Sequence, residues 1–281
     1  MGCEAAHDSN LNESELPGMS SATACLLLND PPGSGAWNMA VDEMLLEWSS
    51  QSGRAAWRWY AWEEPTVSLG YFQKASDRAQ HGPSAGCAWV RRATGGGAIV
   101  HDAEWTYSCV LPIQHPAARH RDLLYRAVHE AFIAALGAVG IAAQWARGET
   151  AAATAGPQSY VCFQRRSPGD VVVGPHKILG SAQRRTARAV LQHGSLLLRR
   201  SPAAPELPGI CDLAGGILPL EEVRAGCLQR LARALALDWT PGELTPAMFQ
   251  RSTYWVGARY GLAAWNVDRS RASQEDAPEF A

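Results

Sequence analysis

Residues 91–102 have the sequence RRATGGGAIVHD and place three consecutive glycines between two segments that favour β-strand. Because they lack Cβ atoms, Gly95, Gly96 and Gly97 let backbone N–H groups approach a ligand closely, and such a turn can hold an oxyanion. The stretch is not a P-loop, since no Gly-Lys-Ser/Thr sequence follows. It is not a dinucleotide-binding loop either, since Val100 stands where the third glycine belongs.

Alternating and helically spaced apolar residues predict further elements along the chain. Strands are expected at Ala24–Leu28, Trp57–Ala61, Thr66–Tyr71, Trp89–Arg92, Ala98–His101, Thr106–Leu111, Val171–Val173, Lys177–Gln183 and Ala189–Leu198. Helices are expected at Trp37–Ser49, Leu123–Val139, Leu220–Ala236 and Pro246–Arg259. We expect the first helix to be buried on one face only. Strands mixed with helices that do not strictly alternate favour an α+β fold with mixed or antiparallel sheets flanked by helices.

The 281 residues suffice for one large domain with a substantial core. We expect this domain to span residues 22–265. Residues 1–21 are polar and are expected to form a flexible N-terminal extension, and residues 266–281 a flexible C-terminal tail. Residues 148–156 are small and featureless, which predicts a mobile loop.

Charge and cysteine usage exclude several classes of protein. A net charge of -2 gives no basic field that could recruit nucleic acid. No apolar run approaches the ~20 residues that span a bilayer, and the first twenty residues contain Asp, Glu and Asn, so neither membrane insertion nor export is expected. The seven cysteines are scattered and never form CxxC, which predicts no metal centre and favours a reducing cytoplasm.

Two further stretches carry candidate reactive groups. Residues 161–185, VCFQRRSPGDVVVGPHKILGSAQRR, contain Cys162 and Lys177. A free thiol is only ~3% thiolate at pH 7, so a nucleophilic Cys162 needs a nearby cation such as Lys177. Residues 191–198, LQHGSLLL, place His193 and Gly194 inside an apolar strand, which suggests contact with a ligand.

Each of these features also has an ordinary structural interpretation. The glycines could form a flexible hairpin and Cys162 could be a small buried side chain. Lys177 could be a solvated surface ammonium and His193 a hydrogen-bonded core histidine. Cys87 and Cys109 are rival nucleophiles, although the apolar strand around Cys109 favours a packing role.

Four stretches together resemble the lipoate-protein ligase A and octanoyltransferase family. They are NMAVDE at 38–43, RRATGGGAIVHD, KILGSAQRR at 177–185 and LQHGSLLL, and the resemblance covers about residues 24–262. It implies a fold like that of the biotin/lipoyl protein ligase catalytic domain. It also implies an enzyme that moves octanoyl or lipoyl groups to a lysine of lipoyl domains or of the glycine cleavage H protein.

Within the family, HDAEWTYS and VCF resemble the ATP-independent octanoyltransferases. That resemblance implies an octanoyl thioester on Cys162 with Lys177 beside it, octanoyl-acyl carrier protein as donor, and no cofactor or metal. The substrate-binding residues it implies are Arg92, Gly95, Gly96, Gly97, His101, Gly180, Ser181, Ala182, His193 and Gly194. Gly97 stands where many such transferases are expected to have Arg, so an ATP-dependent lipoate ligase stays open. Octanoyl transfer between lipoyl-type proteins and a non-catalytic binding module are further alternatives.

Overall fold

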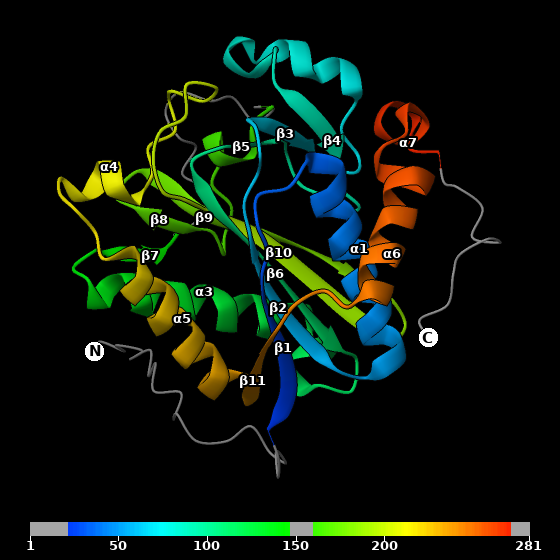
Figure 1. Ribbon diagram of the computed structural model, residues 1–281. Coiled ribbons are helices and arrows are strands. Elements are labelled where there is room, and N and C mark those ends of the chain that lie inside the picture. The colour runs from blue at the N-terminus through cyan, green and yellow to red at the C-terminus, as the bar shows by residue number, and fades with distance from the viewer. Residues whose placement is uncertain (1–21, 147–159, 271–281) are drawn as a thin grey trace, which may run out of the picture.

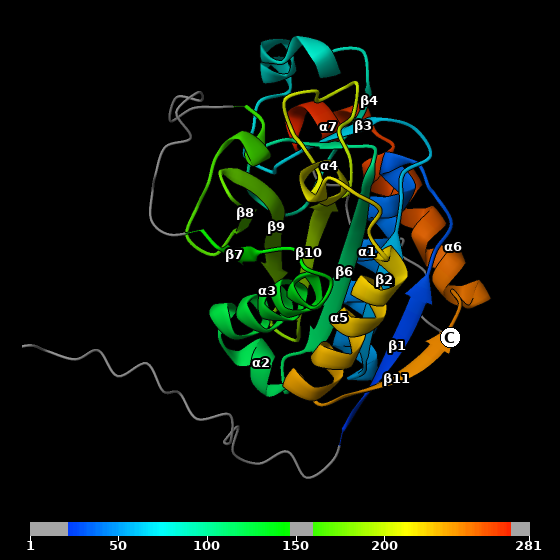
Figure 2. The same ribbon diagram turned by 90° about the vertical axis from the view of Figure 1, so that its left-hand side faces the viewer.

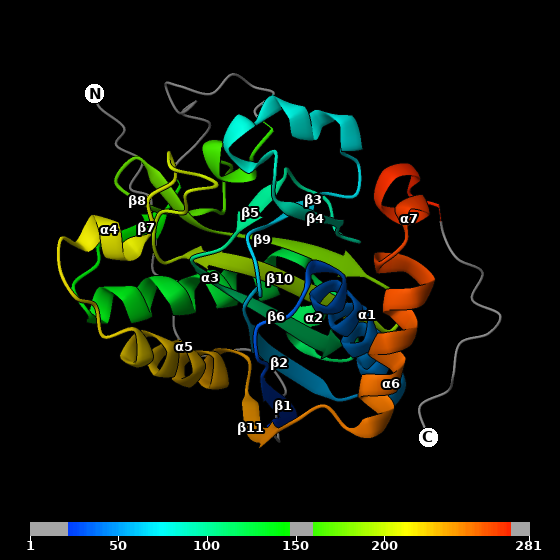
Figure 3. The same cartoon turned by 45° about the horizontal axis from the view of Figure 1, so that its top comes forward.

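In a computed structural model that describes residues 22–146 and 160–270, an eight-stranded mixed sheet forms the centre (Figure 1). Its strands are, in spatial order, β11 (Leu237–Gly242), β1 (Thr23–Asn29), β2 (Ala55–Tyr60), β6 (Glu104–Pro112), β10 (Ala189–Leu197), β9 (His176–Arg185), β8 (Val171–Val173) and β7 (Ala143–Trp145). β11, β1 and β2 run parallel, and each later neighbour is antiparallel. A small sheet lies above one end of the large one (Figure 3). Its order is β4 (Ala88–Arg91), β3 (Thr66–Leu69) and β5 (Ile99–His101).

Helices cover both faces of the large sheet. They are α1 (Gly35–Ser52), α2 (Pro116–Arg119), α3 (Arg121–Ala138), α4 (Ile210–Ala214), α5 (Leu220–Ala234), α6 (Pro246–Trp255) and α7 (Ala263–Asp268). Figures 1 and 2 show α3 and α5 on one face and α1 and α6 on the other. Short 3-10 turns occupy Ala75–Gln80, Gly82–Ser84 and Cys162–Gln164, and a π-helical turn, Val256–Tyr260, follows α6. This layered arrangement confirms the expected α+β class.

The core on the α3 side is largely aromatic. Tyr107 of β6 stacks on Trp57 of β2, with ring centroids 4.7 Å apart and planes within 2° of parallel. Phe132 of α3 packs against Tyr107 with ring centroids 5.6 Å apart. Stacked and tilted aromatic pairs of this kind stabilise a core beyond the area they bury. These packed rings therefore stabilise the part of the sheet that lies under the cavity described below.

The expectation that the first helix is buried on one face only is wrong. Its acidic residues Asp42 and Glu43 are buried as well as its apolar ones. Asp42 pairs with Arg58 of β2 at 3.1 Å, and Glu43 pairs with Arg259 at 3.0 Å. Buried carboxylates persist where a cation and hydrogen bonds compensate their desolvation. Charge in the sequence marked this face as exposed, but partners from distant segments bury it.

Some expectations concern the ends of the chain and one loop. α7 crosses the expected start of the C-terminal tail at 266, and the Asn266 side chain accepts from the Arg91 N–H at 2.8 Å. This part of the expected tail is therefore helical and packed. Residues 1–21, most of the expected tail and the loop expected at 148–156 lie outside the described residues.

Across the described ranges, no helix has the length and apolarity needed to cross a membrane. The same ranges contain no group of three or more His, Cys, Asp or Glu side chains that could bind a metal ion.

Candidate functional site

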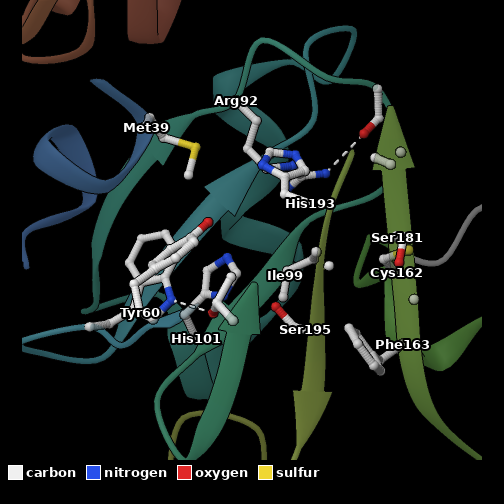
Figure 4. Close-up of a pocket in the computed structure, with 17 residues that line it drawn as sticks. Met39, Tyr60, Arg92, Ile99, His101, Cys162, Phe163, Ser181, His193 and Ser195 are labelled. Atoms are coloured by element: carbon white, nitrogen blue, oxygen red, sulfur yellow. Dashed lines mark hydrogen bonds between the residues drawn. The ribbon is translucent and has the colours of Figure 1, made fainter. Parts of the chain in front are cut away.

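A partly enclosed cavity lies over the large sheet and crosses four neighbouring strands, β2, β6, β10 and β9. Figure 4 shows Cys162, Phe163 and Ser181 along one side of it and Met39 and Tyr60 along the other. The residues expected at a substrate site that line it are Arg92, Gly95, Gly96, His101, Cys162, Gly180, Ser181, Ala182, His193 and Gly194. Gly97 and Lys177 lie just behind this lining, in contact with Cys162. The stretches singled out in the sequence therefore meet at one place.

Cys162 begins a 3-10 turn and lies against the glycine loop, residues 95–97. Its N–H donates to the Ala98 carbonyl at 2.7 Å, and the Ala98 N–H donates to the Tyr160 carbonyl at 3.0 Å. A Cβ on Gly97 would lie 3.1 Å from the Cys162 Cα and 2.7 Å from a guanidinium nitrogen of Arg165. Glycine at 97 thus leaves room for Arg165, a cation from another segment.

The thiol of Cys162 faces the ammonium of Lys177, with Sγ and Nζ 3.5 Å apart. Burial raises the pKa of the Cys162 thiol, but Lys177, Arg92 and the Gly97 N–H lower it by more, and the net pKa lies below its ordinary value. Burial lowers the pKa of Lys177, but Cys162 and Asp170 raise it by more. Both shifts favour the thiolate–ammonium pair, which is the state a sulfur nucleophile requires. The solvated-lysine interpretation is wrong, because Lys177 is only 6% exposed.

A β-bulge turns Lys177 toward Cys162. Val171 pairs with Leu179, and the next residue, Val172, pairs with Lys177, so Ile178 is an extra residue in β9. Residues two apart on a regular strand face the same side, and one inserted residue reverses that relation. Leu179 and Ile178 both pack in the core below the sheet. The bulge therefore frees Lys177 to leave that core and face the thiol.

Arg92 holds the glycine loop in shape from inside the protein. Its guanidinium donates to the carbonyls of Gly95 and Gly97, each at 3.0 Å, and to the Ser68 hydroxyl at 2.7 Å. Ser68 in turn bonds Nε2 of His101 at 2.6 Å. Burial lowers the pKa of Arg92 to about 10, which leaves it charged at neutral pH. Arg92 thus orders the loop carbonyls, and its charge lies beside the cavity.

His193 connects the glycine loop to α1. Its Nδ1 lies 2.9 Å from an Asp42 carboxylate oxygen, and its Nε2 lies 2.7 Å from the Thr94 hydroxyl. Gly194 is equally constrained, since a Cβ there would lie 2.4 Å from the Ser181 hydroxyl. The core-histidine interpretation and the site interpretation of His193 both apply, because a fully bonded ring still lines the cavity.

Several site residues were not expected from the sequence. The cavity is also lined by Met39, Tyr60, Trp62, Ile99, Thr106, Phe163 and Ser195, and Asp170 contacts Lys177. The Trp62 Nε1–H donates to Thr106 at 2.9 Å, and its ring stacks on His101 with centroids 3.8 Å apart. The cluster of tryptophans in residues 57–62 was visible in the sequence, but only the fold shows which of them reach the cavity.

The rival cysteines differ from Cys162 in their surroundings. Cys109 is fully buried among apolar side chains, where burial raises the pKa of its thiol to about 12. Burial also raises the pKa of Cys87. The packing role expected for Cys109 is confirmed by its place in the core. In both residues burial favours the thiol over the thiolate.

The chain is similar to proteins of known family. Residues 34–204 match the family of the lipoyl protein ligase A/B catalytic domain. The chain is 34% identical to the octanoyltransferase LipM of Kyrpidia tusciae over 267 residues, 85% of this chain and 97% of that protein. It is also 34% identical to the octanoyltransferase LipM of Bacillus anthracis, over 86% of this chain and 97% of that protein.

Solved structures show the same fold. A lipoate-protein ligase A bound with ATP superposes with a TM-score of 0.69 at 22% identity, over 88% of this chain and 98% of that one. A bi-partite lipoate protein ligase from Thermoplasma acidophilum also gives a TM-score of 0.69, at 20% identity, over 90% of this chain and 99% of that one. The chain is therefore an acyltransferase that belongs to the lipoyl protein ligase A/B family.

Proposed function

We propose that this enzyme moves an octanoyl group from octanoyl-acyl carrier protein to Cys162, and from Cys162 to a lysine of a lipoyl domain or of the glycine cleavage H protein. One observation carries the proposal: a partly buried thiol lies 3.5 Å from a buried ammonium beside a cavity that could hold an acyl chain. Octanoyl is proposed as the acyl group because the curated relatives are named octanoyltransferase LipM.

In the first half-reaction the Cys162 thiolate attacks the carbonyl carbon of the donor thioester. The bond between that carbon and the carrier sulfur breaks, and Lys177 gives its proton to the departing sulfur. One thioester replaces another, so the exchange is close to thermoneutral and needs no ATP. Cys162 then carries the octanoyl group, and Lys177 is a neutral amine.

In the second half-reaction the amine of the acceptor lysine attacks the Cys162 thioester. Lys177 takes a proton from the attacking nitrogen, the C–S bond breaks, and Cys162 leaves as a thiolate. The products are an amide and the starting ion pair, so the proton given up in the first step is recovered in the second. An amide is more stable than a thioester, which drives the transfer.

The cavity provides the place for the acyl chain. It extends from Cys162 across β9, β10 and β6 to Tyr60 and Trp62 near the end of β2. Burying the seven carbons beyond the carbonyl contributes on the order of 5 kcal/mol, at ~0.8 per methylene. Because this free energy comes from apolar burial, the affinity is expected to depend on the length of the acyl chain and not on a charged head group.

Mass spectrometry of the intact protein tests the proposal. Mixed with octanoyl-acyl carrier protein alone, the wild type is expected to gain one octanoyl group on Cys162, and Cys162→Ser none. Addition of a lipoyl domain without ATP is then expected to move the group to the domain's lysine. If no adduct forms, and octanoate with ATP yields an acyl-adenylate, the protein is a ligase. An octanoylated lipoyl domain offered as donor checks transfer between lipoyl-type proteins.

A further inference from the structure

A carboxylate also contacts the ammonium of Lys177. Asp170 precedes β8, and its Oδ2 lies 2.9 Å from Nζ of Lys177. Oδ2 also accepts the Ser167 N–H at 2.7 Å, and the Asp170 carbonyl accepts the Ala146 N–H at 2.8 Å. Lys177 and the Ser167 N–H therefore hold the carboxylate, and Ala146 holds the backbone of Asp170, which is 4% exposed as a residue.

Lys177 requires such a partner because its side chain is long and flexible. Four methylenes carry its charge, and an unrestrained ammonium samples several rotamers. The backbone of Gly180 closes one side, since a Cβ there would lie 2.6 Å from Cε of Lys177 and 3.6 Å from Oδ1 of Asp170. The ammonium is therefore confined between a carboxylate, a thiol and the strand backbone.

We propose that Asp170 is a positioning residue that holds Nζ of Lys177 beside Sγ of Cys162. The inference extends the proposed function, in which Lys177 gives a proton to the departing sulfur and later takes one back. Asp170 touches neither acyl group nor acceptor and acts through Lys177. Its negative charge disfavours the thiolate but also raises the pKa of Lys177 and so favours the ammonium. Removal of the oxygens and removal of the charge are therefore tested separately.

Two variants separate these effects. Asp170→Ala removes the acceptor for Nζ, so Lys177 is free to leave the thiol, and the pH midpoint of Cys162 alkylation by iodoacetamide is expected to rise. Asp170→Asn keeps an oxygen that can hold Nζ and removes only the negative charge, so its midpoint is expected to lie closer to that of the wild type than the midpoint of Asp170→Ala does. We expect kcat for octanoyl transfer to fall at least tenfold in Asp170→Ala, with donor KM changed less than threefold, and to stay within threefold of wild type in Asp170→Asn.

Asp212 provides a matched control. Its carboxylate also holds a loop, accepting the N–H groups of Gly209 and Arg200 at 2.8 and 2.7 Å, away from the cavity. Asp212→Ala is therefore expected to keep the wild-type alkylation midpoint. Equal midpoints in the two Asp170 variants, or a lower midpoint in Asp170→Ala, would overturn the positioning role. Iodoacetamide alkylation needs no acyl donor, so this result stands even if the wild type forms no octanoyl thioester and the proposed function fails.

Discussion

The surroundings of Cys162 and Cys109 show how one side chain acquires two characters in one protein. Burial acts on both thiols and raises the pKa of each. At Cys109 nothing opposes it, and the pKa rises to about 12. At Cys162 the Lys177 ammonium, 3.5 Å away, together with Arg92 and the Gly97 N–H, outweighs it. Burial alone therefore favours the unreactive thiol, whereas burial next to a confined cation favours the thiolate that the proposed nucleophile requires.

Replacing each cysteine tests this contrast most directly. Cys162→Ser is expected to lower octanoyl transfer by about 1000-fold or more, since a hydroxyl stays protonated where the thiol ionises. Cys109→Ala is expected to leave the rate nearly unchanged and to lower the free energy of unfolding by about 1 kcal/mol. Steady-state transfer assays and urea denaturation measure the two effects. Loss of transfer in Cys109→Ala would end the distinction between the two sites.

Removing the cation should make Cys162 resemble Cys109. Lys177→Met keeps a long side chain, so burial is left unopposed by the ammonium and the pKa of the Cys162 thiol rises. Because less thiolate is then present at neutral pH, transfer is expected to fall about 100-fold. Iodoacetamide alkylation of Cys162 is expected to shift to higher pH. Lys74→Met, at an exposed lysine, is the control, and an unshifted curve in Lys177→Met would refute the electrostatic explanation.

His129 extends the comparison to a group whose pKa is governed by burial. Burial lowers its pKa to about 3, whereas in the unfolded chain it takes up a proton below about pH 6.5. The unfolded state therefore binds more protons between these values, and stability is lost as pH falls from 6.5 toward 3. The loss at pH 5 is expected to be about 2 kcal/mol, close to thirtyfold in the folding equilibrium.

Urea denaturation at pH 7 and pH 5 measures this loss. His129→Asn is expected to reduce the pH dependence by about the 2 kcal/mol assigned to His129, whatever its stability at pH 7. His120→Asn, at an exposed histidine, should keep the wild-type dependence. A His129→Asn variant as sensitive to acid as the wild type would assign the effect to other groups.

The smallest expected effect comes from one methyl group. In Gly180→Ala the new Cβ would lie 2.6 Å from Cε and 2.9 Å from Nζ of Lys177. The lysine must shift away, and transfer is expected to fall about tenfold with little change in fold, by the sensitivity of catalysis to small displacements. Gly137→Ala in α3 meets nothing within 4 Å and is expected to raise stability by about 0.5–1 kcal/mol at unchanged rate. The steady-state rate of octanoyl transfer and the thermal unfolding temperature of both variants measure these effects.

Much of the framework follows from local sequence. Apolar runs joined by short turns located β9 and β10 to within two residues, and β10 is buried along its whole length. The short strands β7 and β11 were not expected, since neither carries a clear alternation and each depends on a neighbour already in the sheet. Pairing between distant segments supplies what local pattern lacks.

The candidate site was only partly predictable for a related reason. Motif order placed Cys162 and Lys177 in one protein region, but the side that Lys177 faces depends on a single extra residue in β9. Asp170 follows Ser167, Pro168 and Gly169, a sequence typical of a turn, and its contact with Lys177 arises from the turn between β8 and β9. These contacts depend on how the chain folds back on itself, so the spacing of apolar residues along the sequence does not predict them.

The bond from the Cys162 N–H to the Ala98 carbonyl limits how the reaction can be assisted. In many acyl-transfer enzymes the nucleophile's own amide helps to stabilise the negative oxygen of the tetrahedral intermediate. Here the Cys162 N–H already donates to the Ala98 carbonyl, and the Ala98 N–H donates to the Tyr160 carbonyl. In the proposed reaction, other donors must therefore stabilise the developing negative charge. The groups that stabilise this charge are then different from the residue that provides the nucleophile.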